Sequence, residues 1–257
     1  MAGSGATTQP GTGTELPLSI VIPAYNEQGR LPGTLPRIQT FLTSPSRACE
    51  IIVVDDGSSD GTAGVIADMQ GRFPQLRLLR NDGNRGKGYS VRRGMLEARG
   101  AHVLFTDADL STPIEEVDKL LPWFDRGFEV VIGSRAMRES RIVRHQPGYR
   151  EAMGRVFNLM AQSWALRGIR DTQCGFKCFR REAAHDVFSR QTLSGFCFDV
   201  EALYIASRLG YRIKEVPVTW ANSPETKVRA LRDSTRMFMD LLKIRARHRG
   251  LTRAIRR

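Results

Sequence analysis

The chain has 257 residues, of which 41% are hydrophobic, and a formal net charge of +12. This length fits one large α/β domain or two small ones, with enough apolar residues for a substantial core. No stretch approaches the ~18 consecutive apolar residues of a membrane-spanning helix, and residues 1–17 lack the basic start and apolar core of a signal peptide. We therefore expect a disordered tail over residues 1–17 and a cytoplasmic protein.

Five short apolar segments in the first half predict β-strands, and the segments between them have helical character. The predicted strands are residues 18–22, 50–54, 76–79, 102–105 and 129–132. The predicted helices are residues 28–42, 60–72, 87–99 and 113–124. Near-continuous apolar strands that alternate with helices indicate an α/β fold with a mostly parallel sheet flanked by helices.

The second half is less regular. Residues 136–148 have no periodicity and many arginines, which predicts a mobile loop. The remaining predicted elements are helices over 149–166 and 198–209, an extended segment over 172–179 and a strand over 211–218.

Near the C-terminus, apolar residues recur at helical spacing with basic residues between them. These apolar residues are Val228, Leu231, Phe238, Leu241 and Leu242. The pattern predicts a basic amphipathic helix; the alternative is a helix packed on the domain with a solvated basic face. We expect a domain over 18–225, with halves of about 18–135 and 136–225, followed by this helix and a tail over 226–257.

Positive charge is concentrated in two segments. Residues 227–257 contain eleven Lys and Arg against two Asp, and residues 135–155 contain six Arg against two Glu. Such local patches favour an anionic partner, such as nucleic acid, an anionic membrane or a phosphorylated substrate. Because no nucleic-acid-binding motif or aromatic stacking platform accompanies the charge, we expect no nucleic-acid partner.

The cysteines indicate neither a disulfide framework nor a metal centre. Their spacing matches no disulfide pattern, so free thiols are the simplest interpretation for a cytoplasmic protein. Cys174 and Cys178 lack a second pair at zinc-ligand spacing.

The strand that begins at Val103 stops at two carboxylates, Asp107 and Asp109. Two acids at the end of a buried strand are unfavourable unless a positive charge lies between them. Mg²⁺ or Mn²⁺ would supply that charge and leave coordination sites for phosphate. The alternative for these residues alone is a solvated loop or a helix N-cap.

Polar motifs follow all five predicted strands of the first half. In chain order they are PAYNE (23–27), DDGSSDGT (55–62), NRGKG (84–88), DADLS (107–111) and GSR (133–135). In such sheets, ligands bind at the carboxyl ends of the strands. Five polar clusters on one edge therefore predict an active site there.

The residue types in these motifs suggest individual roles. Tyr25 offers a flat face for a base, and Glu27 an acceptor for a base or ribose. One of Asp55 and Asp56 would accept hydrogen bonds from the nucleotide, while Lys87 at a helix start favours an anionic group. The alternatives are a turn, a helix cap and a solvated lysine.

The second half adds candidates for a phosphorylated acceptor. An arginine fork binds phosphate bidentately, which makes Arg135 and a downstream arginine such as Arg150 candidates. Asp171 and Asp199 are candidates for organising the acceptor, and either could instead be an N-cap or an ion-pair partner.

The ordered motifs resemble those of the family 2 glycosyltransferases, which have the GT-A fold. The later runs DTQCGFKCF, FDVE and VPVTWANSPETKVRALRDS look more specifically like those of polyprenyl- or dolichyl-phosphate β-glucosyltransferases. The resemblance spans about residues 18–245.

The resemblance implies roles for individual residues. The nucleotide-sugar site it implies comprises Pro23, Ala24, Tyr25, Glu27, Asp55, Asp56, Lys87, Asp107, Ala108 and Asp109. Asp107 and Asp109 would also hold the metal, and Arg135 and Arg150 the acceptor phosphate. The implied catalytic residues are Asp109, Arg135, Asp171 and Asp199.

The implied reaction is an inverting, metal-dependent transfer of a hexose, most simply glucose from UDP-glucose, to a polyprenyl or dolichyl phosphate. The alternatives are GDP-mannose as the donor and a soluble or glycan acceptor. A lipid phosphate is largely ionised near neutral pH and hardly needs a general base. We further expect peripheral association with the inner face of an anionic membrane, and homo-oligomers are compatible with the sequence.

Overall fold

The computed structural model describes residues 16–43, 48–164, 166, 168–223 and 230–251, without the side chains of Trp164 and residues 230–237. The predicted tail lies outside the described residues except for Leu16 and Pro17, whose carbonyls accept backbone hydrogen bonds from Ala101 and His102. The predicted domain boundaries stay predictions.

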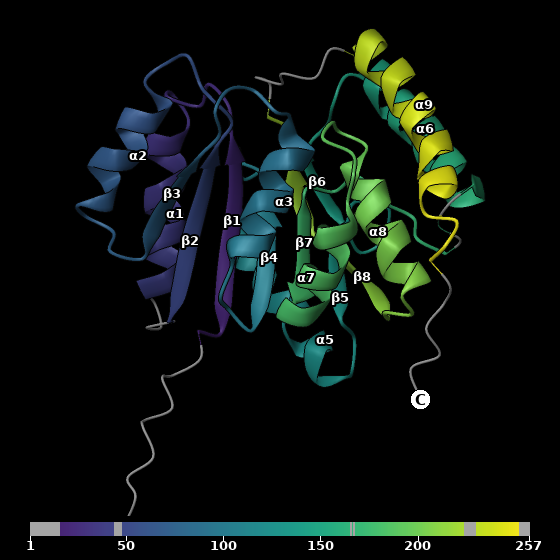
Figure 1. Cartoon of the computed structure of the whole chain (residues 1–257), viewed down its shortest axis with the longest axis horizontal. Helices are drawn as coiled ribbons and strands as arrows, with labels where there is room; N and C mark the ends of the chain where they lie inside the picture. The colour runs from purple at the N-terminus through teal and green to yellow at the C-terminus, as the bar shows by residue number, and fades with distance from the viewer. Residues whose placement is uncertain (1–15, 44–47, 165, 167, 224–229, 252–257) are drawn as a thin grey trace, which may run out of the picture.

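A mixed sheet forms the centre of the molecule (Figure 1). Within the described residues it has seven strands in the order β3-β2-β1-β4-β7-β5-β8. The strands are β1 (Leu18–Ala24), β2 (Cys49–Asp55), β3 (Leu76–Arg80), β4 (His102–Thr106), β5 (Val130–Ser134), β7 (Phe176–Arg180) and β8 (Ile213–Pro217). All neighbours are parallel except β7, which is antiparallel to both β4 and β5. The predicted mostly parallel sheet flanked by helices is therefore confirmed.

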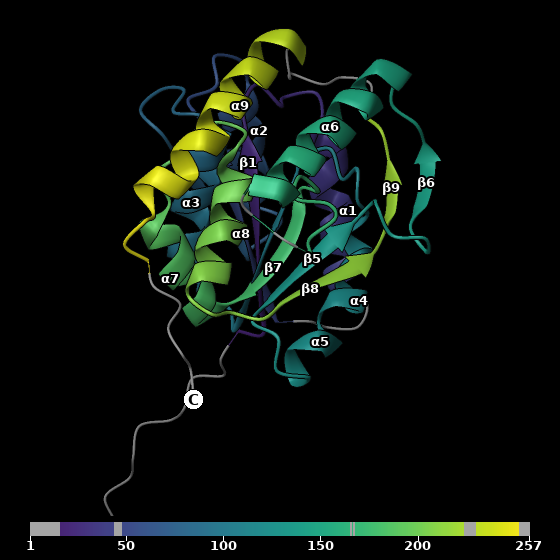
Figure 2. The ribbon, with the colours of Figure 1, turned by 90° about the vertical axis from the view of Figure 1, so that its right-hand side faces the viewer.

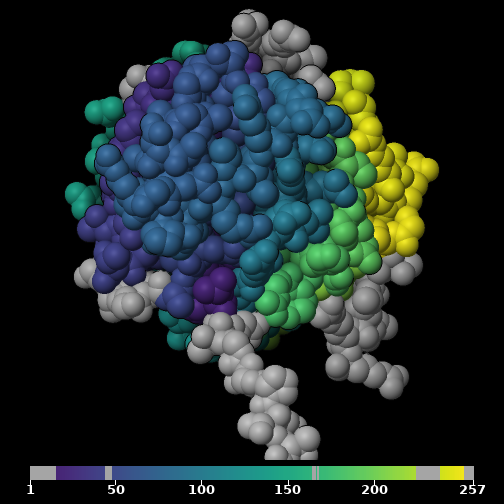
Figure 3. Space-filling model, turned by 60° about the vertical axis from the view of Figure 1, so that its left-hand side comes forward, coloured from purple at the N-terminus to yellow at the C-terminus, as the bar shows by residue number. Residues whose placement is uncertain are grey.

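Helices cover both faces of the sheet because side chains along each strand point alternately to opposite sides. In β1, Val21 packs into one core, whereas Ile20 and Ile22 pack into the other. The first core includes residues of α3 (Lys87–Glu97), α7 (Arg181–Arg190) and α8 (Phe198–Arg208). Figure 3 shows a continuous surface that runs from the blue segments through the green ones to the yellow helix α9 (Ala230–Arg247).

The second core is built by helices of the N-terminal half and by a broken helical segment. Its elements are α1 (Leu31–Thr43), α2 (Thr62–Gln70), the 3-10 turn η1 (Ile114–Glu116), α4 (Val117–Leu120) and α5 (Pro122–Asp125). The helical character predicted over 113–124 is confirmed, although the segment is broken into the three short pieces η1, α4 and α5. Pro122 cannot donate the backbone hydrogen bond that a continuous helix needs at this point, and it begins α5 instead.

The predicted loop over 136–148 contains a strand, so that prediction is wrong in part. β6 (Arg141–Arg144) pairs in parallel with β9 (Thr219–Ala221) and forms a second, two-stranded sheet. Its pairing partner lies more than seventy residues away, and β6 is largely exposed. Sequence periodicity reports burial, so it could not reveal this strand.

Two further helices, α6 (Gly148–Trp164) and α9 (Ala230–Arg247), pack against each other. In Figure 2, α6 lies between α9 and the pair β6–β9, and Figure 1 shows both helices at the end of the sheet to which β1 and β2 point. The basic amphipathic character predicted for 226–257 stays a prediction, since residues 226–229 and 252–257 and the side chains of residues 230–237 lie outside what the structure describes.

Large exposed hydrophobic side chains gather on these elements. Apart from Tyr25, all such residues in the described part of the chain lie on β6, α6 and α9, namely Val143, Tyr149, Val156, Leu159, Phe238, Met239 and Leu242. We refer to these seven residues as the apolar surface. No helix within the described ranges is long and apolar enough to cross a membrane.

Candidate active site

The polar motifs predicted to meet at one sheet edge do so, because they follow the parallel strands β1, β2, β3, β4 and β5. We call the loops after β1–β5 the carboxyl edge. The loop before β7, residues 171–175, reaches the same edge because β7 runs antiparallel to its neighbours. The antiparallel direction of β7 therefore brings Asp171, already a predicted site residue, and Gly175 to this edge.

Asp107 lies at the centre of this edge, and its carboxylate is paired with a lysine. Lys87 Nζ lies 2.6 Å from Asp107 Oδ1, and both side chains are partly exposed. A Cβ atom at Gly175 would overlap the Asp107 carboxylate, so a larger residue there would displace this side chain. Asp107 is thus held between the start of α3 and the loop that leads into β7.

Asp109 sits in a less favourable environment for charge. Burial and the nearby Asp107 carboxylate raise its pKa above the ordinary value, although the Ser111 backbone N–H donates to Oδ1 at 2.9 Å. The next residue, Leu110, adopts a φ of 45°, a conformation that is uncommon outside glycine. A chain bent in this way at two neighbouring acids is consistent with a functional constraint.

The pair could supply part of the coordination shell of a hard cation. Mg²⁺ is commonly bound through one or two carboxylates, with water and substrate phosphate at the other positions. Among the described residues, no group of three or more His, Cys, Asp or Glu could hold a metal alone. The donor set of Asp107 and Asp109 therefore fits a cation that is shared with a phosphorylated ligand.

Lys87 is held by a tightly packed turn at the start of α3. A Cβ at Gly86 or Gly88 would overlap backbone atoms of residues 193–195, and Gly88 N–H donates to Ser194 O at 2.8 Å. Burial disfavours the charged amine, but the carboxylates of Asp107, Asp199 and Asp109 outweigh it and raise the pKa of Lys87. The lysine is therefore fully charged at neutral pH.

The loops after β1 and β2 are tied to each other. Asn26 N–H donates to Ser58 Oγ at 2.9 Å, and Asn26 Oδ1 accepts from Ser59 N–H at 2.9 Å. Glu27 accepts a hydrogen bond from Arg30 at 2.7 Å, while the neighbouring Tyr25 is 36% exposed. The PAYNE motif thus presents an aromatic ring from a fixed loop.

Asp55 and Asp56 have different environments. Asp56 accepts from Asn81 Nδ2 at 2.8 Å and from the backbone N–H groups of Arg85 and Gly86 at 3.0 and 2.8 Å, which fixes the loop before Lys87. Asp55 is fully buried; its Oδ1 accepts from Ser58 N–H at 3.0 Å.

The second oxygen of Asp55 faces Arg80, a residue that lines an open pocket. Oδ2 lies 3.3 Å from Arg80 Nε but receives no hydrogen bond from the described residues. The pocket has a volume of about 350 Å³ and is lined by Gly57, Arg80, Asn81, Asp82 and Gly83.

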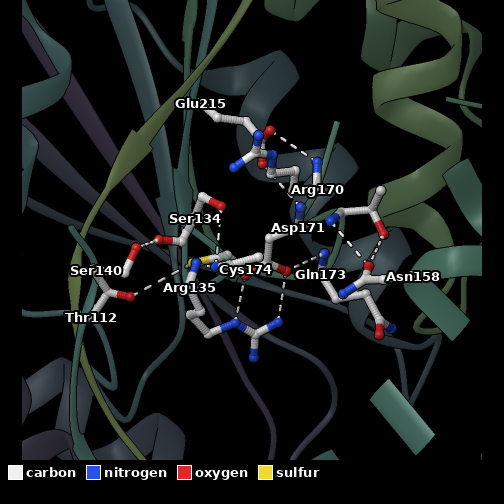
Figure 4. Close-up of polar contacts among 12 residues, drawn as sticks. Thr112, Ser134, Arg135, Ser140, Asn158, Arg170, Asp171, Gln173, Cys174 and Glu215 are labelled. Atoms are coloured by element: carbon white, nitrogen blue, oxygen red, sulfur yellow. Dashed lines mark hydrogen bonds and ion pairs between the residues drawn. The ribbon is translucent and has the colours of Figure 1, made fainter. Parts of the chain in front are cut away.

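Arg135 forms a bidentate pair with Asp171 (Figure 4). Arg135 Nε and Nη2 donate to the two Asp171 oxygens at 2.7 and 2.8 Å, and Arg135 N–H donates at 2.9 Å. Burial raises the pKa of Asp171, but the Arg135 guanidinium outweighs it and lowers this pKa to about 2. The Glu215 carboxylate accepts from the Arg170 and Asp171 backbone N–H groups at 2.9 Å. Asp171 is therefore a fixed anchor for Arg135.

Asp199, in the first turn of α8, is buried and paired with a lysine that the sequence interpretation missed. Lys177 Nζ lies 2.5 Å from Asp199 Oδ1, and the Lys177 side chain is 0% exposed. A lysine inside the otherwise apolar strand FKCF was a signal that could have identified it. Arg150 lies in the first turn of α6 and donates to Tyr149 Oη, and no contact joins it to Arg135 within the described ranges. The roles predicted for these residues stay predictions.

The free thiols predicted from cysteine spacing are confirmed. All four cysteines are free and buried. Burial and the nearby Asp171 carboxylate raise the pKa of Cys174 to about 11.

Similar proteins of known fold share this architecture. Mannosyl-3-phosphoglycerate synthase from Rubrobacter xylanophilus is 21% identical with a TM-score of 0.67, covering 94% of this chain and 77% of that one. Glucosyl-3-phosphoglycerate synthase from Mycobacterium tuberculosis, in complex with Mn²⁺, UDP and glucosyl-3-phosphoglycerate, is 20% identical with a TM-score of 0.66, covering 94% and 86%. These similarities show that the chain has the GT-A fold.

Closer relatives match along most of the sequence. The dolichyl-phosphate beta-glucosyltransferase of Dictyostelium discoideum is 37% identical to this chain, and the match covers 90% of this chain and 74% of that protein. The protein of the same name from Drosophila melanogaster is 38% identical, and the match covers 91% of this chain and 76% of that protein. The human protein of that name is 36% identical over 90% of this chain and 75% of its own. A family model described as Glycosyl transferase family 2 matches residues 19–188, and the chain therefore belongs to this family.

Proposed function

We propose that the chain transfers glucose from UDP-glucose to a dolichyl or other polyprenyl phosphate. The observation that carries this proposal is the meeting of Asp107, Asp109 and Lys87 at the carboxyl edge of a GT-A sheet. Two acids and a charged lysine match the needs of a leaving diphosphate and its cation. The donor sugar and the lipid acceptor follow from the relatives named dolichyl-phosphate beta-glucosyltransferase.

The donor would lie along the carboxyl edge, within the half of about 18–135. The nucleobase would occupy the pocket lined by Gly57, Arg80 and Gly83, next to the loop that follows Asp55. Asp107 and Asp109 would hold Mg²⁺ or Mn²⁺, which when bound neutralises charge on the departing diphosphate. Lys87 would move from Asp107 Oδ1 to a diphosphate oxygen.

The acceptor phosphate would lie beside Arg135, in the half of about 136–225. A phosphate oxygen attacks the anomeric carbon, the bond from that carbon to the nucleoside diphosphate breaks, and no proton has to be removed from an ionised phosphate. The carboxylates of Asp171 and Asp199 are buried and paired with Arg135 and Lys177. That pairing suits positioning better than proton transfer, so inversion by a single displacement requires no general base here.

The apolar surface would rest on the membrane that carries the lipid. It lies at the same end of the molecule as the carboxyl edge (Figure 2), and exposed arginines accompany it, such as Arg144, Arg155 and Arg245. Apolar residues flanked by basic ones are typical of binding to an anionic membrane surface. Sedimentation with liposomes tests this, since equally weak binding to anionic and neutral liposomes would contradict it.

One incubation tests donor and acceptor together. The full chain is mixed with Mg²⁺, dolichyl phosphate and either UDP-glucose or GDP-mannose, and lipid products are identified by mass spectrometry. We expect glucosyl phosphodolichol from UDP-glucose and no product after chelation of the metal. A mannosylated lipid would show that GDP-mannose, and not UDP-glucose, is the donor. Product formed only with a short water-soluble acceptor would show that the acceptor is not a lipid phosphate.

A further inference from the structure

Lys177 is a buried lysine in the middle of the sheet. It lies in β7 between β4 and β5, and its side chain is 0% exposed. A buried amine is unfavourable unless it is paired, and an apolar residue of similar size is often equally stabilising in such a position. Stability alone therefore does not account for a lysine here.

The contacts of Lys177 all lie next to the carboxyl edge. Its Nζ donates to Asp199 Oδ1 at 2.5 Å and to the Cys174 carbonyl at 2.6 Å, and it lies 5.2 Å from the centre of the Phe105 ring. Cys174 adjoins Gly175, which packs on the Asp107 carboxylate. The amine thus fixes both α8, through Asp199, and the loop that leads into β7.

Asp199 connects Lys177 to Lys87. It interacts electrostatically with both lysines, and Lys87 in turn pairs with Asp107 at 2.6 Å. The ion pairs Lys177–Asp199 and Lys87–Asp107, together with the attraction between Asp199 and Lys87, link four side chains of alternating charge, which we call the charge row. Lys87 Nζ also lies 5.8 Å from the centre of the Phe198 ring, so the start of α8 flanks the lysine.

The backbone around Lys87 is fixed independently of the charge row. Gly86 and Gly88 pack against residues 193–195 without room for a Cβ atom. The Lys87 side chain must still span the distance to Asp107, and a flexible four-carbon chain is not oriented by its backbone alone. Charges on either side of its amine supply that orientation.

We propose that Lys177 is a positioning residue that acts through Asp199 to orient Lys87 toward the diphosphate of the nucleotide sugar. This inference depends on the proposed function for the role of Lys87. Lys177 and Asp199 touch neither donor nor acceptor, and their effect is confined to the binding of the diphosphate.

Two variants test the proposal, and the double variant leaves no buried charge unpaired. Lys177→Met/Asp199→Asn removes both charges together, and Asp199→Asn alone keeps an oxygen that can accept from Lys177. Affinity for UDP is measured by calorimetry with and without Mn²⁺, and KM is measured for UDP-glucose and for dolichyl phosphate. Lys119→Met, which removes a half-exposed lysine in α4, is the matched control.

We expect both variants to bind UDP about tenfold more weakly, as for the loss of one well-oriented charged hydrogen bond. KM for UDP-glucose rises in parallel, while KM for dolichyl phosphate and the control variant stay unchanged. In a Lys87→Met background the same substitutions cause no further loss of UDP affinity, because their effect passes through Lys87.

Several results would overturn the inference. If the folded variants bind UDP as tightly as the wild type does, Lys177 has only a structural role. An equal rise in KM for UDP-glucose and for dolichyl phosphate would lead to the same conclusion. A full additional loss in the Lys87→Met background would show that the effect bypasses Lys87. If the wild-type chain binds neither UDP nor GDP, the proposed function itself fails and this inference fails with it.

Discussion

At the carboxyl edge, polar side chains are bound by neighbouring loops, whereas on the apolar surface large hydrophobic side chains face solvent. Asp56 alone accepts three hydrogen bonds from the loop before Lys87, and Asp171 holds Arg135 through two parallel ones. Leu159 and Val156, in contrast, are 63% and 56% exposed. The first region is fixed before any ligand arrives, and the second has apolar area available for a partner. Substitutions in the two regions should therefore change different measurements.

The largest effect is expected for Asp109→Asn. Removing this charge at the predicted cation site should lower kcat/KM by roughly 10²–10³-fold, the scale seen when one electrostatic group is lost from an active site. Transfer to a short water-soluble polyprenyl phosphate analogue measures it. Val156→Ser, on the apolar surface, is the control and should retain activity with this analogue. Comparable losses in both variants would contradict the division between the two regions.

Asp56→Ala should mainly affect stability. Three donors lose their acceptor, at about 1 kcal/mol each, so the free energy of unfolding should fall by roughly 3 kcal/mol. Urea denaturation measures this, with Val156→Ala as the exposed control, for which we expect a change within about 0.5 kcal/mol. An unchanged midpoint for Asp56→Ala would show that the loop before Lys87 does not depend on this carboxylate.

The ionised Asp171 carboxylate should increase the free energy of unfolding by an amount that depends on pH. Its pKa is about 2 in the folded protein and ordinary when unfolded, so the contribution is present above about pH 4 and is lost as the pH falls toward 2. This lowering of the Asp171 pKa corresponds to about 2–3 kcal/mol in the free energy of unfolding. The difference in unfolding free energy between wild type and Asp171→Asn, measured from pH 5 to pH 2, should shrink across this window. A difference that stays constant with pH would rule out the ion pair as its source.

The smallest effect is expected for Leu159→Ser. The exposed side chain contributes little to folding, so thermal stability should stay the same. Loss of one leucine from membrane contact is worth roughly 1–2 kcal/mol, which predicts about tenfold weaker binding to anionic liposomes. Sedimentation measures the binding, and Lys119→Met on the opposite half serves as the control. Unchanged binding would remove α6 from the proposed membrane contact.

The sequence by itself determined the alternation of strands and helices in the first half and the meeting of five polar motifs at one edge. Both follow from local rules, since hydrophobic periodicity reports burial and parallel strands share a carboxyl end. The order of the motifs also indicated the family, which the comparisons confirm.

Only the tertiary structure decided which charges pair at that edge. The sequence does not state that β7 runs antiparallel between β4 and β5, yet this places Asp171, Gly175 and Lys177 in the site. The pairing of Lys87 with Asp107 and of Lys177 with Asp199 joins residues that are 20 and 22 positions apart. Such contacts depend on how elements that are distant in the sequence pack against each other. A local sequence pattern does not determine that packing.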